Sequence, residues 1–344
     1  GSVWILQNML IYLMPCGVLK TLNGECGMMW KNKNVLVTGG MGLVGGHLVE
    51  RLVELEANVV VTKIINDPHS YFNRKTLGDK VIVADCDLKN EQQVKDVITK
   101  CEIEIIFHLG AQALVPVAYH NPRETIETNI MGTVNILETA RNYPGVKAIV
   151  FASSDKAYGI SDKLPYYETH ELKGQHPYDV SKSAADLICT AYFKTYDVPV
   201  VTTRFGNIYG PGDLNFNRIV PGAIKSGLNG EPLEIRSDGK MIRDYVYVKD
   251  VVSGYLTLAE NIEKTKGEAF NVSSGVTLNV LDMVNHVSEV MDNEIKVNIL
   301  NNAKNEIPEQ YLDYSKISNL LNWSPKYKLA DALKETIDWY KEVI

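Results

Sequence analysis

The chain has 344 residues, of which 45% are hydrophobic and 22% are charged, and its 35 Lys and Arg against 42 Asp and Glu give a net charge of −7. These values exclude a disordered or fibrous chain and allow about two domains. A pI of about 5.6 also argues against a nucleic-acid partner, because neutralising a polyanion needs a surplus of basic residues.

The first segment of the chain is apolar but lacks the pattern of a membrane span. Residues 3–19 are interrupted by Gln7 and Asn8, broken by Pro15 and Gly17, and not preceded by basic residues. We therefore expect no membrane partner, and we expect residues 1–29 to form an extension or leader outside the enzyme core.

The cysteines indicate a reducing compartment. The chain has five of them, an odd number, with no C-x-x-C pair. Neither a disulfide framework nor a metal site is expected, and a cytoplasmic location is favoured.

Short β-branched runs alternate with amphipathic helical stretches from Lys33 to about residue 204. This alternation predicts right-handed β-α-β crossovers and hence a doubly wound parallel sheet, an α/β fold. The expected strands are 34–38, 58–62, 80–84, 103–108, 147–153 and 198–203, and the expected helices are 43–56, 91–100, 125–142 and 178–196.

Beyond about residue 204 the pattern loosens into loops, with short strands at LEIRS, YVYV and AFNVS and helices near 278–291 and 328–341. We expect a cofactor-binding domain over residues 30–203. Residues 204–344 are expected to form mainly a smaller α+β substrate-binding lobe, with some segments returning to the first domain.

A glycine turn follows the first expected strand. Gly39, Gly42 and Gly45 allow a tight turn, close approach of a pyrophosphate and close helix packing, while Leu43 and Val44 begin the helix. The N-terminus of that helix offers unpaired N–H groups to an anion. The turn therefore predicts a dinucleotide site.

The G-x-x-G-x-x-G spacing resembles that of the extended short-chain dehydrogenase/reductases, in the epimerase/dehydratase group, and the resemblance covers about residues 33–340. It implies a Rossmann domain that binds NAD. Lys63 stands at the end of the second strand, where the family usually places an acid, so NADP stays open. The other cofactor contacts that the resemblance implies are Asp87, Leu88, Leu109, Gly110, Ala111 and Asn129.

Tyr178 and Lys182 lie four residues apart, on one face of an expected helix. A lysine beside a tyrosine favours the phenolate and lowers its pKa, so the phenol could take a proton from a sugar hydroxyl. Both residues are candidate cofactor contacts, and Ser154, after the fifth strand, would bind the same hydroxyl. Together they would prepare C4 of a sugar for hydride transfer.

Asp155 and Lys156 follow the serine directly. Epimerases of this group usually carry unreactive residues there, whereas the CDP-glucose 4,6-dehydratases carry Asp-Lys. A neutral Lys156 could remove the C5 proton and a protonated Asp155 could protonate O6, which would eliminate water. The alternative is a polar turn or helix cap without elimination chemistry.

The second lobe carries candidate contacts to the substrate. Asn207 could donate to a diphosphate oxygen, and Arg218 and Arg243 offer planar guanidinium groups that suit phosphate, although either could be a surface ion pair. Gln112 is a further candidate substrate contact. Relatives dimerise through a four-helix bundle that includes the Tyr178 helix, so a homodimer is expected by analogy.

These features favour an NAD-dependent nucleotide-sugar 4,6-dehydratase, a lyase that supplies deoxysugar or surface-glycan synthesis, with a nucleoside diphosphate sugar as partner. The first alternative is an isomerase, a nucleotide-sugar 4-epimerase acting on a substrate such as UDP-glucose or UDP-N-acetylglucosamine. A remote alternative is a non-catalytic NAD-binding regulator. The nucleotide base and the sugar stay open.

Overall fold

The β-branched runs of the first half of the chain form the strands of one parallel sheet. The computed structural model describes residues 29–302 and 307–344. Its large sheet has seven strands in the order β10-β6-β5-β4-β1-β2-β3, and every pairing in it is parallel. The strands are β1 (Asn34–Thr38), β2 (Asn58–Lys63), β3 (Ile82–Asp85), β4 (Ile105–His108), β5 (Ala148–Ala152), β6 (Val200–Phe205) and β10 (Ala269–Val272).

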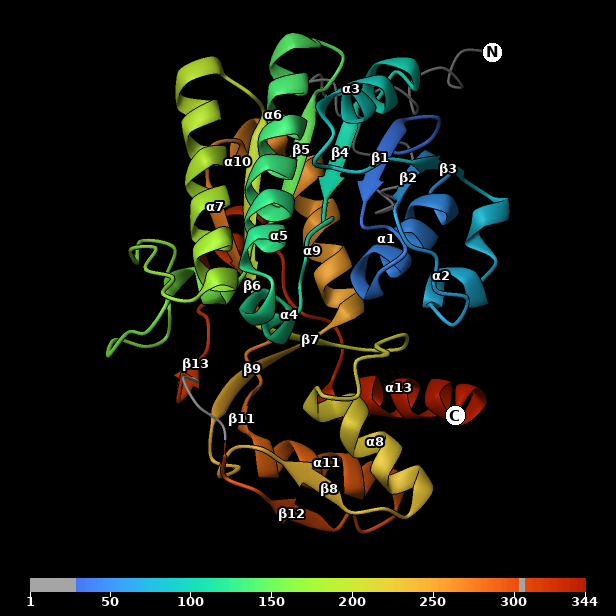
Figure 1. The fold of residues 1–344 in the computed structure, drawn as a ribbon, viewed down its shortest axis with the longest axis vertical. Coiled ribbons are helices and arrows are strands. Elements are labelled where there is room, and N and C mark those ends of the chain that lie inside the picture. The colour runs from blue at the N-terminus through green and yellow to red at the C-terminus, as the bar shows by residue number, and fades with distance from the viewer. Residues whose placement is uncertain (1–28, 303–306) are drawn as a thin grey trace, which may run out of the picture.

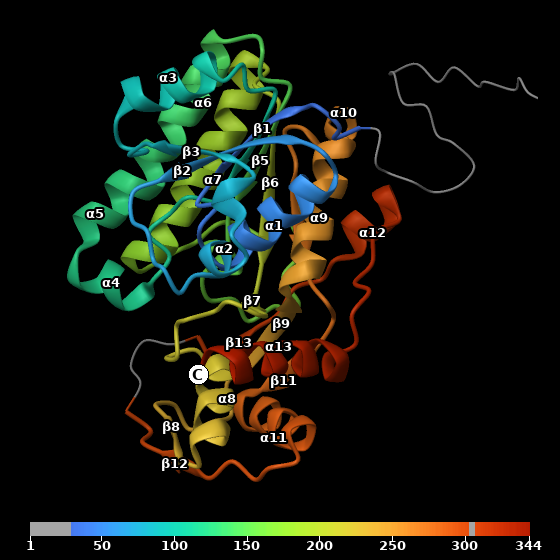
Figure 2. The same cartoon turned by 90° about the vertical axis from the view of Figure 1, so that its right-hand side faces the viewer.

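Helices cover both faces of this sheet, which confirms the doubly wound α/β fold (Figures 1 and 2). One apolar cluster joins the sheet to α1 (Leu43–Glu54) and α9 (Val248–Glu260). Another joins its opposite face to α3 (Glu91–Lys100), α6 (Gly132–Asn142) and α7 (Pro177–Tyr196). The shorter helical elements of this domain are α2 (Tyr71–Arg74), η2 (Leu77–Asp79), α4 (Val115–His120), η4 (Asp155–Tyr158) and α10 (Ile262–Thr265).

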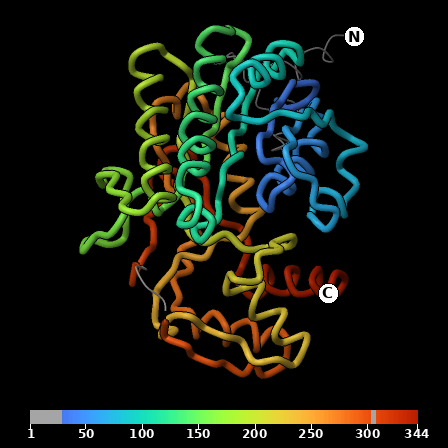
Figure 3. Tube along the Cα trace, in the orientation of Figure 1, coloured from blue at the N-terminus to red at the C-terminus, as the bar shows by residue number. Residues whose placement is uncertain are grey.

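The sequence AFNVS, which we expected in the second lobe, belongs to the large sheet. It is β10 and pairs with β6. The trace in Figure 3 shows this orange segment back within the first domain. A short apolar run gives no indication of which sheet it joins, because sheet pairing is a tertiary choice.

The helix expected over 125–142 is divided. The structure has α5 (Pro122–Ile126), a π-helical turn at Glu127–Met131 and α6. The π turn includes Asn129, whose side chain is turned into the protein. Such turns often mark functional positions in a helix.

The second lobe lies below the sheet in Figure 1. Strand β9 (Ile242–Tyr247) is flanked by β7 (Asn207–Tyr209), β11 (Thr277–Asn279) and β13 (Glu309–Gln310). A pair of strands, β8 (Leu233–Ile235) and β12 (Val297–Ile299), packs near α8 (Ile219–Asn229) and α11 (Val280–Met291). The last helices are α12 (Ser315–Leu321) and α13 (Leu329–Val343).

The core begins at the first described residues. Trp30 is fully buried and its indole donates to Glu260 at 2.7 Å, while Met29 packs against the same apolar cluster. The rest of the expected extension, with the apolar run at 3–19, lies outside the described residues. Among the described residues, no helix is both long and apolar enough to cross a membrane.

Candidate active site

The glycine turn after β1 is so tight that two of its positions exclude any side chain. Gly39 has φ +69°, and a Cβ there would lie 2.9 Å from the backbone N of Gly110. A Cβ on Gly45 would lie 2.1 Å from the carbonyl oxygen of Gly39. Glycine at 45 therefore lets α1 pack directly on the turn.

Gly42 has a different reason to be glycine. It is the N-cap of α1, and the nearest atom to a Cβ there would be the Gly39 oxygen, at an ordinary contact distance of 3.4 Å. The protein itself would tolerate a methyl group at position 42. Because glycine has no such group, the N-terminus of α1 stays open to an anion. Leu43 and Val44 pack instead against the apolar core of the second lobe. The turn thus fits a dinucleotide pyrophosphate.

The loop after β4 is fixed by hydrogen bonds to its neighbours. Gly110 N donates to Thr38 Oγ1 at 2.9 Å, and Gln112 N donates to Asn129 Oδ1 at 2.8 Å. The Asn129 amide in turn donates to Ser181 Oγ of α7 at 2.9 Å. Asn129 therefore holds Leu109–Ala111 against the catalytic helix, and a direct cofactor contact from it stays a prediction.

The residues expected near the adenosine lie at the ends of β2 and β3. Lys63 Nζ lies 3.0 Å from Asp85 Oδ1, and the Asp85 side chain is largely exposed, so the two form a surface ion pair. Asp87 Oδ1 accepts from Lys89 N at 2.9 Å, and Leu88 is buried.

The three candidate catalytic residues are brought together at the carboxyl edge of the sheet. Ser154 follows β5, and Tyr178 and Lys182 lie in the first turns of α7, which begins at Pro177. All three side chains are buried, and Ser154 Oγ donates to Asp155 Oδ1 at 3.2 Å. The structure therefore supports the expected grouping.

The expected effect of the lysine on the phenol is wrong in this structure. Burial and the nearby Asp155 raise the pKa of Tyr178 to about 12 instead of lowering it. Lys182 Nζ donates to the carbonyl oxygen of Ala152 at 2.9 Å, and burial lowers its own pKa to about 8. Burial is the largest cause of both pKa shifts.

Asp155 and Lys156 form the start of η4. Ser154 Oγ accepts from Lys156 N at 3.2 Å and so caps this turn, as the structural alternative expected. The Asp155 side chain is nevertheless almost fully buried, with Lys156 Nζ 3.7 Å from its Oδ1. A buried carboxyl and an amine beside Ser154 and Tyr178 suit proton transfer as well as capping.

The substrate candidates lie in the second lobe and in the loop after β4. Arg218 Nη1 lies 3.1 Å from Asp213 Oδ2, as in the ion-pair alternative, yet its charge still lowers the pKa of Tyr178. Arg243 donates to the carbonyl oxygen of Ile242 at 2.8 Å. Asn207 is partly exposed on β7, and the Gln112 side chain bonds the backbone of Leu114.

Sequence reasoning missed the buried pair that anchors the catalytic helix. Arg204 of β6 makes two hydrogen bonds to Asp186 of α7, at 2.8 and 2.9 Å, and a third to Tyr158 of η4 at 2.9 Å. A signal was available, since Tyr178, Lys182 and Asp186 share a four-residue spacing and hence one helix face. The pair holds η4 and α7 together.

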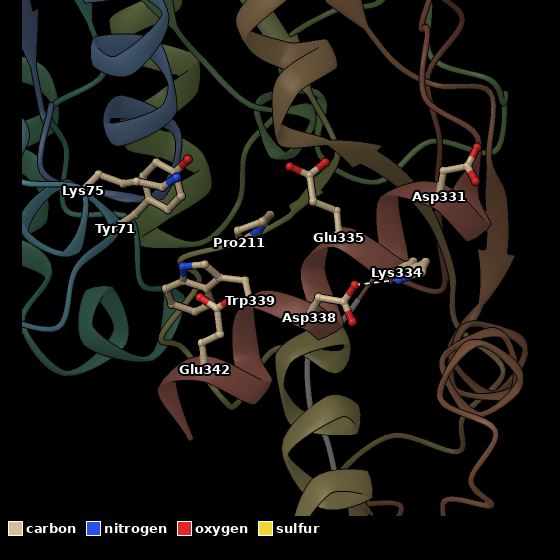
Figure 4. A pocket seen from close by; sticks show the side chains of 9 residues that line it. All are labelled: Tyr71, Lys75, Pro211, Asp331, Lys334, Glu335, Asp338, Trp339 and Glu342. Carbon is tan, nitrogen blue, oxygen red and sulfur yellow. Dashed lines mark hydrogen bonds and ion pairs between the residues drawn. The ribbon is translucent and has the colours of Figure 1, made fainter.

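A hollow of about 460 Å³ lies between α2 and α13 and is lined by none of the expected site residues. Figure 4 shows Trp339 and Glu342 of α13 near Tyr71 of α2 and near Lys75, which follows that helix. Glu335, on the same wall, accepts from Tyr247 at 2.7 Å and pairs with Lys249. The hollow belongs to the contact between the lobes, away from the catalytic groups.

The model of the GDP-mannose 4,6 dehydratase family matches residues 36–336, which is most of the chain. The chain belongs to this dehydratase family. The match includes the glycine turn, η4 and the helix α7 that carries Tyr178 and Lys182.

Individual relatives agree with this assignment. The CDP-glucose 4,6-dehydratase of Salmonella typhimurium is 30% identical over 341 residues, covering 91% of each chain. A trifunctional UDP-glucose 4,6-dehydratase/UDP-4-keto-6-deoxy-D-glucose 3,5-epimerase/UDP-4-keto-L-rhamnose-reductase of Arabidopsis thaliana is 29% identical over 333 residues, covering 91% of this chain. The chain spans about half the length of that relative, 48%.

Solved structures with the same fold include both reaction types. A UDP-glucose 4-epimerase of Thermotoga maritima has a TM-score of 0.82 and 30% identity, covering 90% of this dehydratase-family chain and 99% of its own. A dTDP-glucose 4,6-dehydratase of Bacillus anthracis, in complex with NAD, has a TM-score of 0.80 and 25% identity, covering 90% and 97%.

Proposed function

We propose that the protein is an NAD-dependent nucleotide-sugar 4,6-dehydratase that converts an NDP-hexose to an NDP-4-keto-6-deoxyhexose. The observation that carries this proposal is the buried Asp155 beside Lys156, immediately after Ser154 and in electrostatic contact with Tyr178. The family match and the NAD bound to the Bacillus anthracis relative support it.

When bound, NAD would accept a hydride from C4 of the sugar and later return a hydride to C6. Gly42 and the N-terminus of α1 would hold its pyrophosphate, and Lys182 and Tyr178 would contact its ribose and nicotinamide ring. Ser154 and Tyr178 orient the C4 hydroxyl and take up its proton.

Asp155 and Lys156 would then carry out the elimination of water. Once C4 is a ketone, the C5 proton is acidic, and the amine of Lys156 takes it. Asp155 gives a proton to the departing C6 oxygen, which leaves as water. Arg218, Arg243 and Asn207 would hold the diphosphate at the lobe boundary.

The second candidate function is 4-epimerisation. It is favoured by the 30% identity to the Thermotoga maritima 4-epimerase, and it needs the same tyrosine, lysine and serine. It gives no role to a buried Asp155, which is why the dehydratase is preferred.

The test is to incubate the protein and NAD with UDP-, GDP-, CDP- and dTDP-glucose and with GDP-mannose. We expect one of them to give a 4-keto-6-deoxy product, which absorbs in alkali. Asp155→Asn should lower the rate about a hundredfold or more, the usual effect of losing a general acid. The exposed Asp162→Asn is the matched control and should keep the wild-type rate. An epimer made equally well by Asp155→Asn would overturn the proposal.

We also propose that the protein acts as a homodimer, in the cytoplasm and in deoxysugar or glycan synthesis. Large apolar side chains are exposed on α5, the π turn and α7, which lie side by side in Figure 1: Ile126, Met131, Val180 and Leu187. Covering them with a second copy would remove apolar surface from water. Sedimentation should give a dimer that Leu187→Glu dissociates, whereas a monomeric wild type would refute the proposal.

A further inference from the structure

A buried set of hydrogen bonds, which we call the His108 network, lies next to the glycine turn. Gly110 N donates to Thr38 Oγ1 at 2.9 Å, and Thr38 Oγ1 lies 2.8 Å from His108 Nδ1. On the other side of the ring, His108 Nε2 lies 3.0 Å from Thr133 Oγ1, which donates to the carbonyl oxygen of Asn129 at 2.7 Å. The side chains in the network are all buried, so water has little access to these bonds.

The directions of these bonds determine which nitrogen of His108 carries the proton. Thr133 has one hydroxyl hydrogen, and this hydrogen is used in the bond to Asn129. Thr133 Oγ1 can then only accept from the ring, so His108 Nε2 must carry a hydrogen. In a neutral ring Nδ1 is bare and accepts the hydroxyl hydrogen of Thr38, whose oxygen accepts from Gly110 N. The network therefore runs in one direction from Gly110 to Asn129.

The surroundings of the ring keep it neutral. Burial lowers the pKa of His108 to about 3, and the positive charge of Lys182 acts in the same direction. His108 stacks on Phe151 with ring centroids 5.7 Å apart, and Lys182 Nζ lies 5.5 Å from the centroid of the same Phe151 ring. A protonated ring would also lose the bare nitrogen that accepts from the Thr38 hydroxyl. Both the charge and the hydrogen bonds thus favour one neutral tautomer.

Both ends of the network act on the loop after β4. At one end, the backbone of this loop is so close to the glycine turn that a Cβ on Gly39 would lie 2.9 Å from Gly110 N. At the other end, Asn129 Oδ1 accepts from Gln112 N at 2.8 Å, and the Asn129 amide donates to Ser181 Oγ of α7 at 2.9 Å. The network therefore holds the loop between the turn that fits a pyrophosphate and the helix that carries Tyr178.

We propose that His108 is a positioning residue for NAD, which as its neutral Nε2–H tautomer fixes the loop after β4 between the glycine turn and α7. Its own side chain is enclosed by the protein, so it acts through the backbone of this loop. Thr133 selects the tautomer, because its hydroxyl can only accept from the ring. The proposal concerns the binding of NAD and applies equally to a dehydratase and to an epimerase.

The first test observes the proton on the ring. Nitrogen NMR of protein with isotope-labelled histidine distinguishes a protonated ring nitrogen from a bare one, and the His108 signals are identified by their contact with the Phe151 ring. We expect a protonated Nε2 and a bare Nδ1 in the wild type. Thr133→Val removes the acceptor for Nε2–H, so the proton should then be shared between the two nitrogens. Thr133→Ser keeps the hydroxyl and should restore the wild-type signals.

The second test measures NAD binding with a matched pair of variants, Thr133→Val and Thr336→Val. Thr336 is also buried, and its hydroxyl donates to the carbonyl oxygen of Ala332, four residues earlier in α13, at 2.6 Å. In calorimetric titrations, Thr133→Val should bind NAD at least about tenfold more weakly, because a buried N–H loses its acceptor and the loop must be ordered on binding. Thr133→Ser should recover the affinity, and Thr336→Val should bind NAD as the wild type does.

Chemical denaturation separates positioning from a merely structural role. Both valine variants should lower the unfolding midpoint, but only Thr133→Val should also lose NAD affinity. A wild-type His108 with its proton on Nδ1, or with both nitrogens protonated, would overturn the proposal, and so would wild-type NAD affinity in Thr133→Val. Should Thr133→Val not fold, Thr133→Ala removes the same hydroxyl and takes its place. Neither test uses the sugar product, so failure of the proposed dehydratase activity and failure of this proposal are distinguished.

Discussion

In the proposed reaction Tyr178 takes up the proton of the substrate hydroxyl, and a few charged neighbours act on its phenol. Burial and Asp155 raise its pKa, whereas the positive charge of Arg218 lowers it. A negative charge near a phenol disfavours the phenolate, and a positive charge favours it. Each neighbour can therefore be tested by its effect on one titration.

Replacing Asp155 by Asn should lower the pKa of Tyr178 from about 12, because it removes the carboxylate that opposes ionisation. Arg218→Gln should raise it. Both shifts can be measured without substrate, by nuclear magnetic resonance of ring-labelled tyrosine with Tyr178→Phe to assign the signal. Asp162→Asn should leave the titration unchanged. A Tyr178 signal that does not respond to Asp155→Asn would contradict the electrostatic contact between the two.

At the scale of elements, two glycines at the start of α1 have different roles: Gly45 allows close packing and Gly42 leaves room for an anion. Gly45→Ala should destabilise the fold by about 1–3 kcal/mol, because its Cβ would collide with the Gly39 oxygen and push α1 off the turn. Gly42→Ala should leave the unfolding free energy nearly unchanged and weaken NAD binding at least about tenfold, by filling the anion cradle. Chemical denaturation and calorimetric NAD titration separate the two effects. Equal NAD affinity in Gly42→Ala would refute this placement of the cofactor.

The ion pair between Arg204 and Asp186 joins the strand β6 to the helix α7. Arg204→Met would leave Asp186 buried without a partner and should lower the unfolding free energy by about 3–5 kcal/mol. The double variant Arg204→Met/Asp186→Leu should recover much of that loss. The exposed pair Lys31–Glu56 is the control, and Lys31→Met should cost less than about 1 kcal/mol. If denaturation showed that Arg204→Met and Lys31→Met lower the unfolding free energy equally, the Arg204–Asp186 pair would not be a buried anchor.

For the whole molecule, we expect buried histidines to lower the free energy of unfolding as the pH falls. Burial lowers the pKa of His47 to about 4 and that of His108 to about 3. Between these values and 6.5 the unfolded chain binds protons that the folded chain does not, so stability is present above pH 6.5 and lost as the pH falls. Each histidine should contribute a slope of about 1.4 kcal/mol per pH unit over that range.

Denaturation at a series of pH values checks this slope. His47→Gln keeps a donor for the carbonyl oxygen of Pro211, which lies 2.7 Å from His47 Nε2, and should flatten the profile below pH 6. A profile that is as steep in His47→Gln as in wild type would mean that His47 does not contribute to the loss of stability in acid.

The sheet and the catalytic grouping could be predicted from the sequence because each depends on local pattern. The β-branched run at 34–38 forms β1 over the expected residues, and the four-residue spacing of Tyr178 and Lys182 places them on one face of α7. The joining of β10 to β6 could not be predicted, since strand pairing is long-range. The raised pKa of Tyr178 and the Ser154–Asp155 contact also depend on burial, which pattern alone does not provide.

The site as a whole implies loss of water from the sugar, and the mass of the product tests this most directly. The wild-type protein with NAD is incubated with each of UDP-, GDP-, CDP- and dTDP-glucose and GDP-mannose, and the nucleotide sugars are analysed by mass spectrometry. The account predicts that at least one of them gives a product lighter by one water, with the cofactor oxidised at the end. A product of unchanged mass, the epimer of its substrate, with no lighter species from any of the five, would contradict it.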